Sequence, residues 1–120
     1  FEELEALRYE DHLSSDGKII INTRQIIPVT IKINKSSVYP DDIPGMLQRA
    51  GTGGSGVISV DADALAAKAG NIKAANMVMA GAMSRYTDID ESIWISSIED
   101  IFSGKLTEIN INAFLAGRNI

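Results

Sequence analysis

The stretch over residues 57–86 constrains the fold more than any other part of this 120-residue chain. It begins with the β-branched apolar run Val57-Ile58-Ser59-Val60, which predicts a short buried strand. Small residues, mainly alanine, dominate the remainder, and their spacing is helical. A buried strand followed by closely packed helices is typical of the α/β class. We therefore expect the other segments to cover this unit.

Two helices are predicted after this strand. Asp61 or Asp63 can cap the first helix, over residues 64–69, by accepting a hydrogen bond from a backbone N–H. Gly70 can end it, because glycine adopts the left-handed conformation without a Cβ clash. Asn71 then caps a longer helix that runs to the end of the stretch. The predicted buried face of this longer helix consists of Ala75, Val78, Met79, Ala82, Met83 and Tyr86.

Length and composition exclude several classes of function. The length fits one domain over residues 1–120, and a net charge of −5 with scattered signs leaves no basic stripe for nucleic acid. No run reaches the roughly 18 apolar residues that a membrane-spanning helix needs. The chain has no cysteine, so it forms no disulfide and offers no thiolate to an iron–sulfur cluster or zinc. We expect a cytoplasmic protein, because neither cysteine nor a signal peptide is present.

The segments before this stretch predict one helix, two strands and a further helix. Residues 1–13 form an amphipathic helix whose apolar stripe is Phe1, Leu4, Leu7 and Leu13. Residues 18–22 predict a buried strand and residues 29–33 a half-exposed edge strand. The short connection between them cannot make a parallel crossover, so the strands pair antiparallel or the second lies outside the main sheet. The further helix starts at residues 39–42 and closes at Gly51.

Two helices are predicted after this stretch. The first begins at the capping-box spacing of residues 88–91 and runs to Ser103, before Gly104. Its predicted buried face consists of Ile93, Trp94, Ile98, Ile101 and Phe102. Residues 106–116 are ambiguous, because residues 107–112 alternate like a strand while the apolar positions of the whole segment fit a helix. We choose a helix, since a strand would leave residues 113–117 unexplained.

The glycine-rich run from Gly51 to Gly56 matches the G-x-G-x-x-G spacing of dinucleotide-binding loops. That chemistry needs a strand before the loop and a helix after it, so that the helix N-terminus meets the pyrophosphate. Here a predicted helix precedes the loop and a strand follows it. We interpret the run as a connector, and a nucleotide-binding module stays open as an alternative.

No residue of the chain is assigned a catalytic, cofactor-binding or metal-binding role. His12 is the only histidine, which excludes a two-histidine metal site, and its place on an amphipathic helix favours a surface or packing role. Asp61 and Asp63 could act as an acid–base pair or hold magnesium at the carboxyl end of a strand. Helix capping explains these two carboxylates more simply.

A subunit interface is the site that the sequence predicts instead. The candidate residues are asparagines and small residues on the predicted helices, namely Asn71, Asn76, Ala80, Gly81 and Asn110. The run Ala80-Gly81-Ala82 allows another backbone to come very close. Asn76 lies among small apolar residues and either contacts a neighbouring loop or anchors a partner. The alternative is that this helix packs only within its own chain.

The order of short motifs along the chain points to a family. The first series consists of residues 1–8 (FEELEALR), Asp16-Gly17-Lys18, Asn22-Thr23, Pro28 and Tyr39-Pro40. The second consists of Asp61-Ala62, Leu65-Ala66, Gly70-Asn71, Ala75-Asn76, Gly81-Ala82, Asn110, Ala113-Phe114 and Gly117. Together they resemble the gamma module of 2-oxoacid (pyruvate or indolepyruvate):ferredoxin oxidoreductases, and are most similar to the small (beta) subunits of the indolepyruvate enzymes. The resemblance covers nearly the whole chain.

The resemblance implies an α/β, Rossmann-like domain with a mostly parallel sheet and helices packed on it. The glycine-rich first strand–turn–helix of the family and its Arg-Gly-Gly region would precede Phe1, so we expect a domain truncated at its N-terminus. An unpaired sheet edge would then favour a homo-oligomer.

Enzymes of this family convert a 2-oxoacid to an acyl-CoA by oxidative decarboxylation and pass the electrons to ferredoxin. Their thiamine-diphosphate and iron–sulfur motifs belong to other domains, and none of these motifs occurs in this sequence. The resemblance therefore implies a non-catalytic subunit whose partner is a large subunit holding both cofactors. Ferredoxin would be an indirect partner. A free-standing interaction module without enzymatic activity is the alternative.

Overall fold

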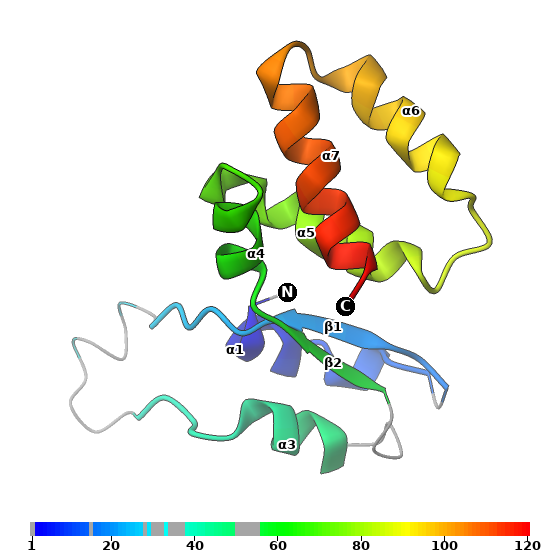
Figure 1. The fold of residues 1–120 in the computed structure, drawn as a ribbon. Helices are drawn as coiled ribbons and strands as arrows, with labels where there is room; N and C mark the ends of the chain where they lie inside the picture. The colour runs from blue at the N-terminus through cyan, green and yellow to red at the C-terminus, as the bar shows by residue number, and fades with distance from the viewer. Residues whose placement is uncertain (1, 15, 28, 30–32, 34–37, 50–55) are drawn as a thin grey trace. The chain divides into compact units, whose positions relative to one another are not determined.

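The computed structural model describes residues 1–120 except 1, 15, 28, 30–32, 34–37 and 50–55 (Figure 1). The chain divides into two units, Phe1–Ser59 and Val60–Ile120, and each is described by itself. Within the described residues, helices pack on a small parallel sheet of two strands, which confirms the predicted α/β class.

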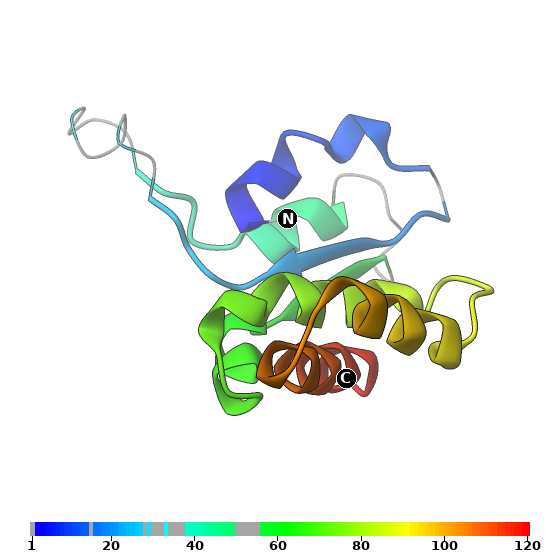
Figure 2. The same ribbon diagram turned by 90° about the horizontal axis from the view of Figure 1, so that it is seen from above.

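The first unit is built around a strand–helix–strand arrangement. Its described elements are α1 (Glu3–Leu7), the 3-10 turn η1 (Glu10–His12), β1 (Ile19–Asn22), α3 (Ile43–Arg49) and β2 (Val57–Val60), whose last residue opens the second unit. The strands β1 and β2 pair directly. Figure 2 shows α1 and α3 side by side, and these two helices contact each other.

Isoleucines and small residues form the core of the first unit. Its buried members are Ala6, Ile19, Ile21, Ile43 and Leu47, and the partly buried side chains of Leu4, Leu7, Leu13, Tyr39 and Val57 pack against them. Isoleucine suits β1 because β-branched side chains pack well on a pleated surface. The strands predicted over residues 18–22 and 57–60 are therefore confirmed, within one residue at the first.

The helix predicted over residues 1–13 is wrong in its length. The helix α1 ends at Leu7, and a turn separates it from η1. Its fully buried residues are Glu3 and Ala6, and the predicted leucines Leu4, Leu7 and Leu13 are partly buried against the core. Of the edge strand predicted over residues 29–33, only Val29 and Ile33 are described, and both are helical and exposed, so the strand prediction is wrong at these two positions. The run from Gly51 to Gly56 lies outside the described residues apart from Gly56 itself.

The second unit is helical after the end of β2. Its elements are α4 (Ala62–Lys68), the 3-10 turn η2 (Ile72–Ala74), α5 (Ala75–Ser84), α6 (Glu91–Ile101) and α7 (Lys105–Arg118). The helix α7 contacts α4, η2, α5 and α6, and Figure 1 shows it between α5 and α6. The ambiguous segment 106–116 is thus helical, as predicted.

The predicted caps of α4 and of the following helix are confirmed. The Asp61 carboxylate accepts a hydrogen bond from the backbone N–H of Ala64 at 2.9 Å. Gly70 has a φ of 111°, and its N–H and that of Asn71 bond back to carbonyls in the last turn of α4, which is a Schellman motif. The Asn71 side chain accepts from the N–H of Lys73 at 3.0 Å. The longer helix starts with the 3-10 turn η2 and ends at Ser84, two residues before the predicted end.

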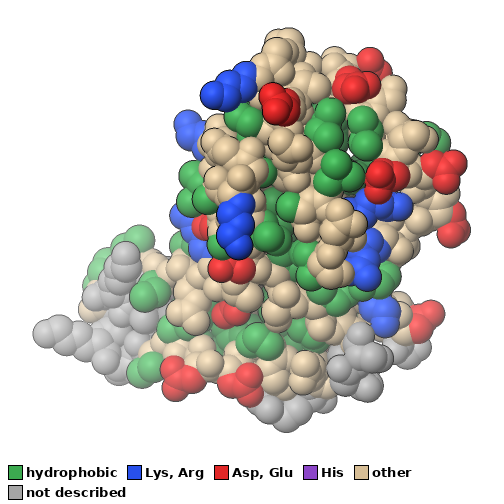
Figure 3. Space-filling view, in the orientation of Figure 1, with side chains coloured by type: hydrophobic (Ala, Val, Ile, Leu, Met, Phe, Trp, Pro, Cys, Tyr) green, Lys and Arg blue, Asp and Glu red, His purple; other side chains and the backbone are tan. Residues whose placement is uncertain are grey.

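Two details of the prediction for α6 are wrong. The N-cap is Asp90, not Asp88 as the capping-box spacing of residues 88–91 requires, and the Asp90 side chain makes no capping hydrogen bond in the described chain. Ile98 is buried as predicted, but Ile93 and Ile101 are 57% and 74% exposed. The reason is that α6 packs mainly on α7, which covers only one narrow face of it. Figure 3 shows apolar and acidic side chains on the surface over this part of the molecule.

Two glycines bring the backbones of α5 and α7 into contact. A Cβ atom added to Gly81 would overlap the carbonyl oxygen of Phe114, and one added to Gly117 would overlap that of Val78. Both overlaps involve backbone, which a change of side-chain rotamer cannot relieve. The predicted buried face of α5 is therefore shifted. Val78 and Ala82 are buried, as are Gly81 and Ser84, whereas Met83 and Tyr86 are about half exposed.

We predict that Gly81→Ala lowers the free energy of unfolding by about 1–3 kcal/mol, because the added methyl group forces the two helices apart. This loss appears although alanine favours a helix over glycine by about 1 kcal/mol. Urea unfolding followed by circular dichroism measures the change. The matched control is Asn76→Ala, at an exposed position of the same helix, which leaves stability equal or slightly higher. Wild-type stability in Gly81→Ala would contradict the close crossing.

Candidate functional site

The five residues predicted for an interface lie in different surroundings. Gly81 is buried against α7 of the same chain, and Asn110 is 7% exposed with its side-chain amide donating to the carbonyl of Leu106 at 2.8 Å. Asn76 is exposed on α5, and Asn71 and Ala80 are half-buried. A partner could therefore reach only the last three directly, and the interface role of all five residues remains a prediction.

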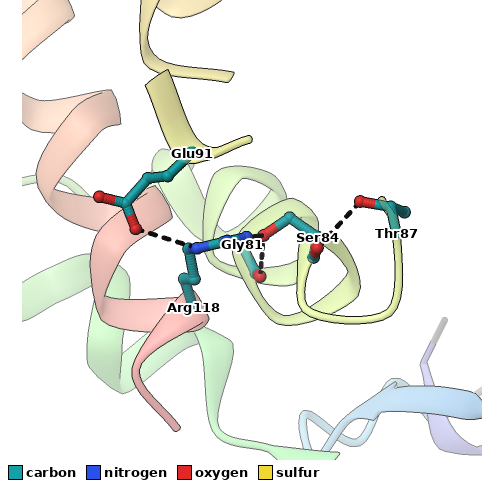
Figure 4. Close-up of polar contacts among 5 residues, drawn as sticks. All are labelled: Gly81, Ser84, Thr87, Glu91 and Arg118. Carbon is teal, nitrogen blue, oxygen red and sulfur yellow. Dashed lines mark hydrogen bonds and ion pairs between the residues drawn. The ribbon is translucent and has the colours of Figure 1, made fainter. Parts of the chain in front are cut away.

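A chain of polar contacts joins the ends of α5, α6 and α7 (Figure 4). Arg118, in the last turn of α7, contacts the Glu91 carboxylate on α6 at 2.9 Å and donates to the Ser84 hydroxyl at 2.7 Å. The Ser84 hydroxyl in turn donates to the carbonyl of Gly81 at 2.6 Å. Thr87 donates its hydroxyl to the carbonyl of Ser84 at 2.9 Å. Both hydroxyls thus add hydrogen bonds to carbonyl groups in the last turn of α5.

The charges in this network agree with the helix dipoles. Arg118 places a cation beside the C-terminal ends of α5 and α7, and Glu91 places an anion in the first turn of α6. Both placements are favourable, because a helix is partly positive at its N-terminus and partly negative at its C-terminus. Ser84 is completely buried and gives its only proton to the backbone. The network therefore has a structural role, and Ser84 has no proton left to give a substrate.

An aromatic contact attaches α6 to α7. The ring of Trp94 stacks on that of Phe114 with centroids 5.7 Å apart and an interplanar angle of 28°. The indole Nε1 of Trp94 is buried and has no hydrogen-bond partner among the described residues. Offset stacking contributes roughly 0.5–1.5 kcal/mol beyond the buried area. The core position of Trp94 was predicted from the sequence, whereas the network of Ser84, Glu91 and Arg118 was not. Contacts between residues so far apart, 34 positions for Ser84 and Arg118, have no local signal.

We predict that Arg118→Gln lowers the free energy of unfolding by about 1–2 kcal/mol, because the buried Ser84 hydroxyl loses a charged donor. Glu91→Gln lowers it by less than about 1 kcal/mol, since its side chain is 47% exposed. Urea unfolding of both single variants and the double variant measures the interaction free energy between Glu91 and Arg118. Lys105→Gln, at the opposite end of α7, is the control and leaves stability unchanged or slightly higher. Additive losses would contradict a direct Glu91–Arg118 contact.

A second polar cluster surrounds Glu2 in the first unit. Its carboxylate accepts hydrogen bonds from the Tyr39 hydroxyl at 2.6 Å and from the backbone N–H groups of Ile26 at 3.3 Å and Glu5 at 3.2 Å. The last bond caps α1. A shallow depression beside the carboxylate is lined by Glu2, Leu4, Glu5, Arg8 and Ile26.

The surroundings of Glu2, Glu3 and Tyr39 shift the pKa values of these side chains. Burial alone would raise the pKa of the Glu2 carboxyl, but the bonds from Tyr39 and from backbone N–H groups lower it below its usual 4.5. Burial raises the pKa of Glu3, and the negative charge of Glu2 adds to that rise. Burial also raises the pKa of Tyr39 far above 10.0, and its bond to Glu2 adds to the rise. At neutral pH Glu2 is thus an anion that holds a protonated Tyr39.

We predict that Tyr39→Phe lowers the free energy of unfolding by about 1–2 kcal/mol at pH 7. Because the pKa of Glu2 is lowered in the folded state, its charged form stabilises the fold above pH 4.5, and that contribution is lost as the pH falls further. The difference in the free energy of unfolding between wild type and Tyr39→Phe should therefore become smaller as the pH is lowered from 7 to about 3. Urea unfolding at both pH values measures it. Tyr86→Phe, at a half-exposed ring, is the control, and an equal loss at both pH values would contradict this assignment.

The remaining candidates for chemistry lie apart from these clusters. His12 is exposed at the end of η1 and meets the ring of Tyr9 edge-on with centroids 5.9 Å apart. Asp61 caps α4, and Asp63 lies in the first turn of that helix. Within the described ranges, no group of three or more metal-binding side chains is placed to hold a metal ion. No helix in the described part of the chain is long and apolar enough to cross a membrane.

These features define an α/β protein in which the buried side chains of Ser84 and Asn110 bond to the backbone of their own helices. The chain belongs to the pyruvate ferredoxin/flavodoxin oxidoreductase family, whose profile matches residues 1–120. The family resemblance stated from the sequence is thus confirmed.

Three curated relatives are each named indolepyruvate oxidoreductase subunit IorB. The proteins from Archaeoglobus fulgidus, Methanothermobacter thermautotrophicus and Thermococcus kodakarensis are 33%, 34% and 32% identical to this chain, each over 98% of it. The chain spans 59%, 60% and 58% of their respective lengths. No solved structure matches the chain significantly.

Proposed function

We propose that this chain is a non-catalytic part of a thiamine-diphosphate-dependent 2-oxoacid:ferredoxin oxidoreductase. The enzyme would convert a 2-oxoacid, with indolepyruvate the expected substrate, to an acyl-CoA by oxidative decarboxylation. The observation that carries this proposal is the family match over residues 1–120, together with relatives that are named as indolepyruvate oxidoreductase subunits.

The chemistry of the side chains favours a non-catalytic role. The chain has no cysteine, and an iron–sulfur cluster needs cysteine thiolates. The residues present therefore do not fit a cysteine-ligated cluster. We propose that the clusters and thiamine diphosphate are held by the large partner subunit, and that ferredoxin receives its electrons there.

The described polar clusters agree with a non-catalytic role for this chain. Ser84 and Arg118 bond to each other near the end of α5, and Glu2 holds Tyr39 and caps α1. Each of these groups is already used by the fold. We propose that Asn71, Asn76 and Ala80 face a partner subunit or a second copy, and that the assembly is cytoplasmic. The prediction that residues 1–120 form one domain stays a prediction.

Reconstitution with the companion large subunit tests the proposal. The full-length protein that contains this chain is purified alone and after co-expression with that subunit, and 2-oxoacid- and CoA-dependent reduction of methyl viologen is measured. We predict no reduction and no bound thiamine diphosphate for this protein alone, and activity in a complex that contains both proteins. Turnover or stoichiometric cofactor in the protein alone would contradict a non-catalytic role. Failure of the two proteins to associate would contradict the proposed assembly.

A further inference from the structure

The outer surface of α6 carries an apolar stripe that the second unit leaves uncovered. Ile93 and Ile101 are 57% and 74% exposed, and they lie two turns apart on one side of the helix, with Ser97 between them. The Ser97 hydroxyl donates to the carbonyl of Ile93 at 2.9 Å, so its proton is already used by its own helix. The adjacent face of α6 packs on α7 through Trp94 and Ile98. The exposed isoleucines are therefore not needed to hold α6 in place.

The segment that carries this stripe is acidic. Between Tyr86 and Gly104 the sequence contains no lysine or arginine, and its acidic residues are Asp88, Asp90, Glu91, Glu99 and Asp100. Among the described residues only Glu91 of these five makes an ion pair, with Arg118. In Figure 3 red carboxylates and green apolar side chains share the surface over α6.

Two of these carboxylates lie where the helix itself disfavours them. Glu99 and Asp100 are in the last turn of α6, which has no basic residue. Negative charge at a helix C-terminus opposes the helix dipole. Their placement therefore weakens α6 within the isolated unit. A basic side chain of a partner would compensate the negative charge of Glu99 and Asp100. An apolar surface of the same partner would cover Ile93 and Ile101.

We propose that α6 is a docking helix, and that the stripe of Ile93 and Ile101 inserts into an apolar groove rimmed by lysine and arginine on the large partner subunit. The charges favour such a groove over a second copy of this chain, because two α6 surfaces would place like charges against each other. The identity of the partner rests on the proposed function, whereas the docking surface rests on the exposure and charge of α6.

Binding measurements with two sets of variants test the proposal. The full-length protein is titrated with the companion large subunit by isothermal calorimetry. Ile93→Ser combined with Ile101→Ser should weaken binding at least about tenfold without lowering the melting temperature, because both side chains are exposed. Glu99→Lys combined with Asp100→Lys should weaken binding, remove most of its salt dependence and raise the melting temperature. Ile26→Ser, at an isoleucine of the first unit that is 53% exposed, is the matched control and should bind like wild type.

Each outcome supports or overturns a distinct claim. Wild-type affinity in both sets of variants overturns the docking helix while leaving the proposed function intact. No binding by the wild-type protein itself overturns the proposed assembly, and with it the assignment of the large subunit as partner. Loss of self-association in the isoleucine variants, with unchanged binding to the large subunit, would assign the surface to a second copy and overturn the basic groove.

Discussion

The backbone contact between α5 and α7 is the constraint on which the second unit depends. Gly81 and Gly117 each lie against a carbonyl of the other helix, so any side chain at either position would push the helices apart. Because α7 also contacts α4, η2 and α6, its distance from α5 determines how the other elements pack. Glycine is a poor helix former, and its presence within α5 and in the last turn of α7 is explained by this close approach.

The polar network extends the same contact to the third helix. Arg118 reaches from α7 to Ser84 on α5 and to Glu91 on α6, so one side chain joins three helices near their ends. The α6 helix is otherwise held by a narrow apolar face, chiefly Trp94 and Ile98. Because this narrow face is enough to attach α6, the outer side of the helix is open to solvent. The proposed docking role of α6 uses this open side.

Features with a local cause could be predicted from the sequence, and features that depend on distant packing could not. Asp61, Gly70 and Asn71 act on backbone groups within a few residues, so their capping roles were predicted correctly. The small size of Gly81 indicated a close approach, but nothing local showed that its partner is α7 of the same chain. The bond between Ser84 and Arg118 joins residues 34 positions apart and has no periodic signal. The interface residues remain predictions for the same reason, because a partner leaves no mark on local spacing.

Hydrogen exchange of backbone amides in the wild-type protein tests the central claim most directly. If the contact at Gly81 and Gly117 holds the second unit together, amides in the middle of α5 and α7 should exchange slowest in that unit and should open as one group. Amides of α6 should exchange faster, because one narrow face attaches that helix. Exchange in α6 that is as slow as in α5 and α7, or separate opening of α5 and α7, would contradict the account.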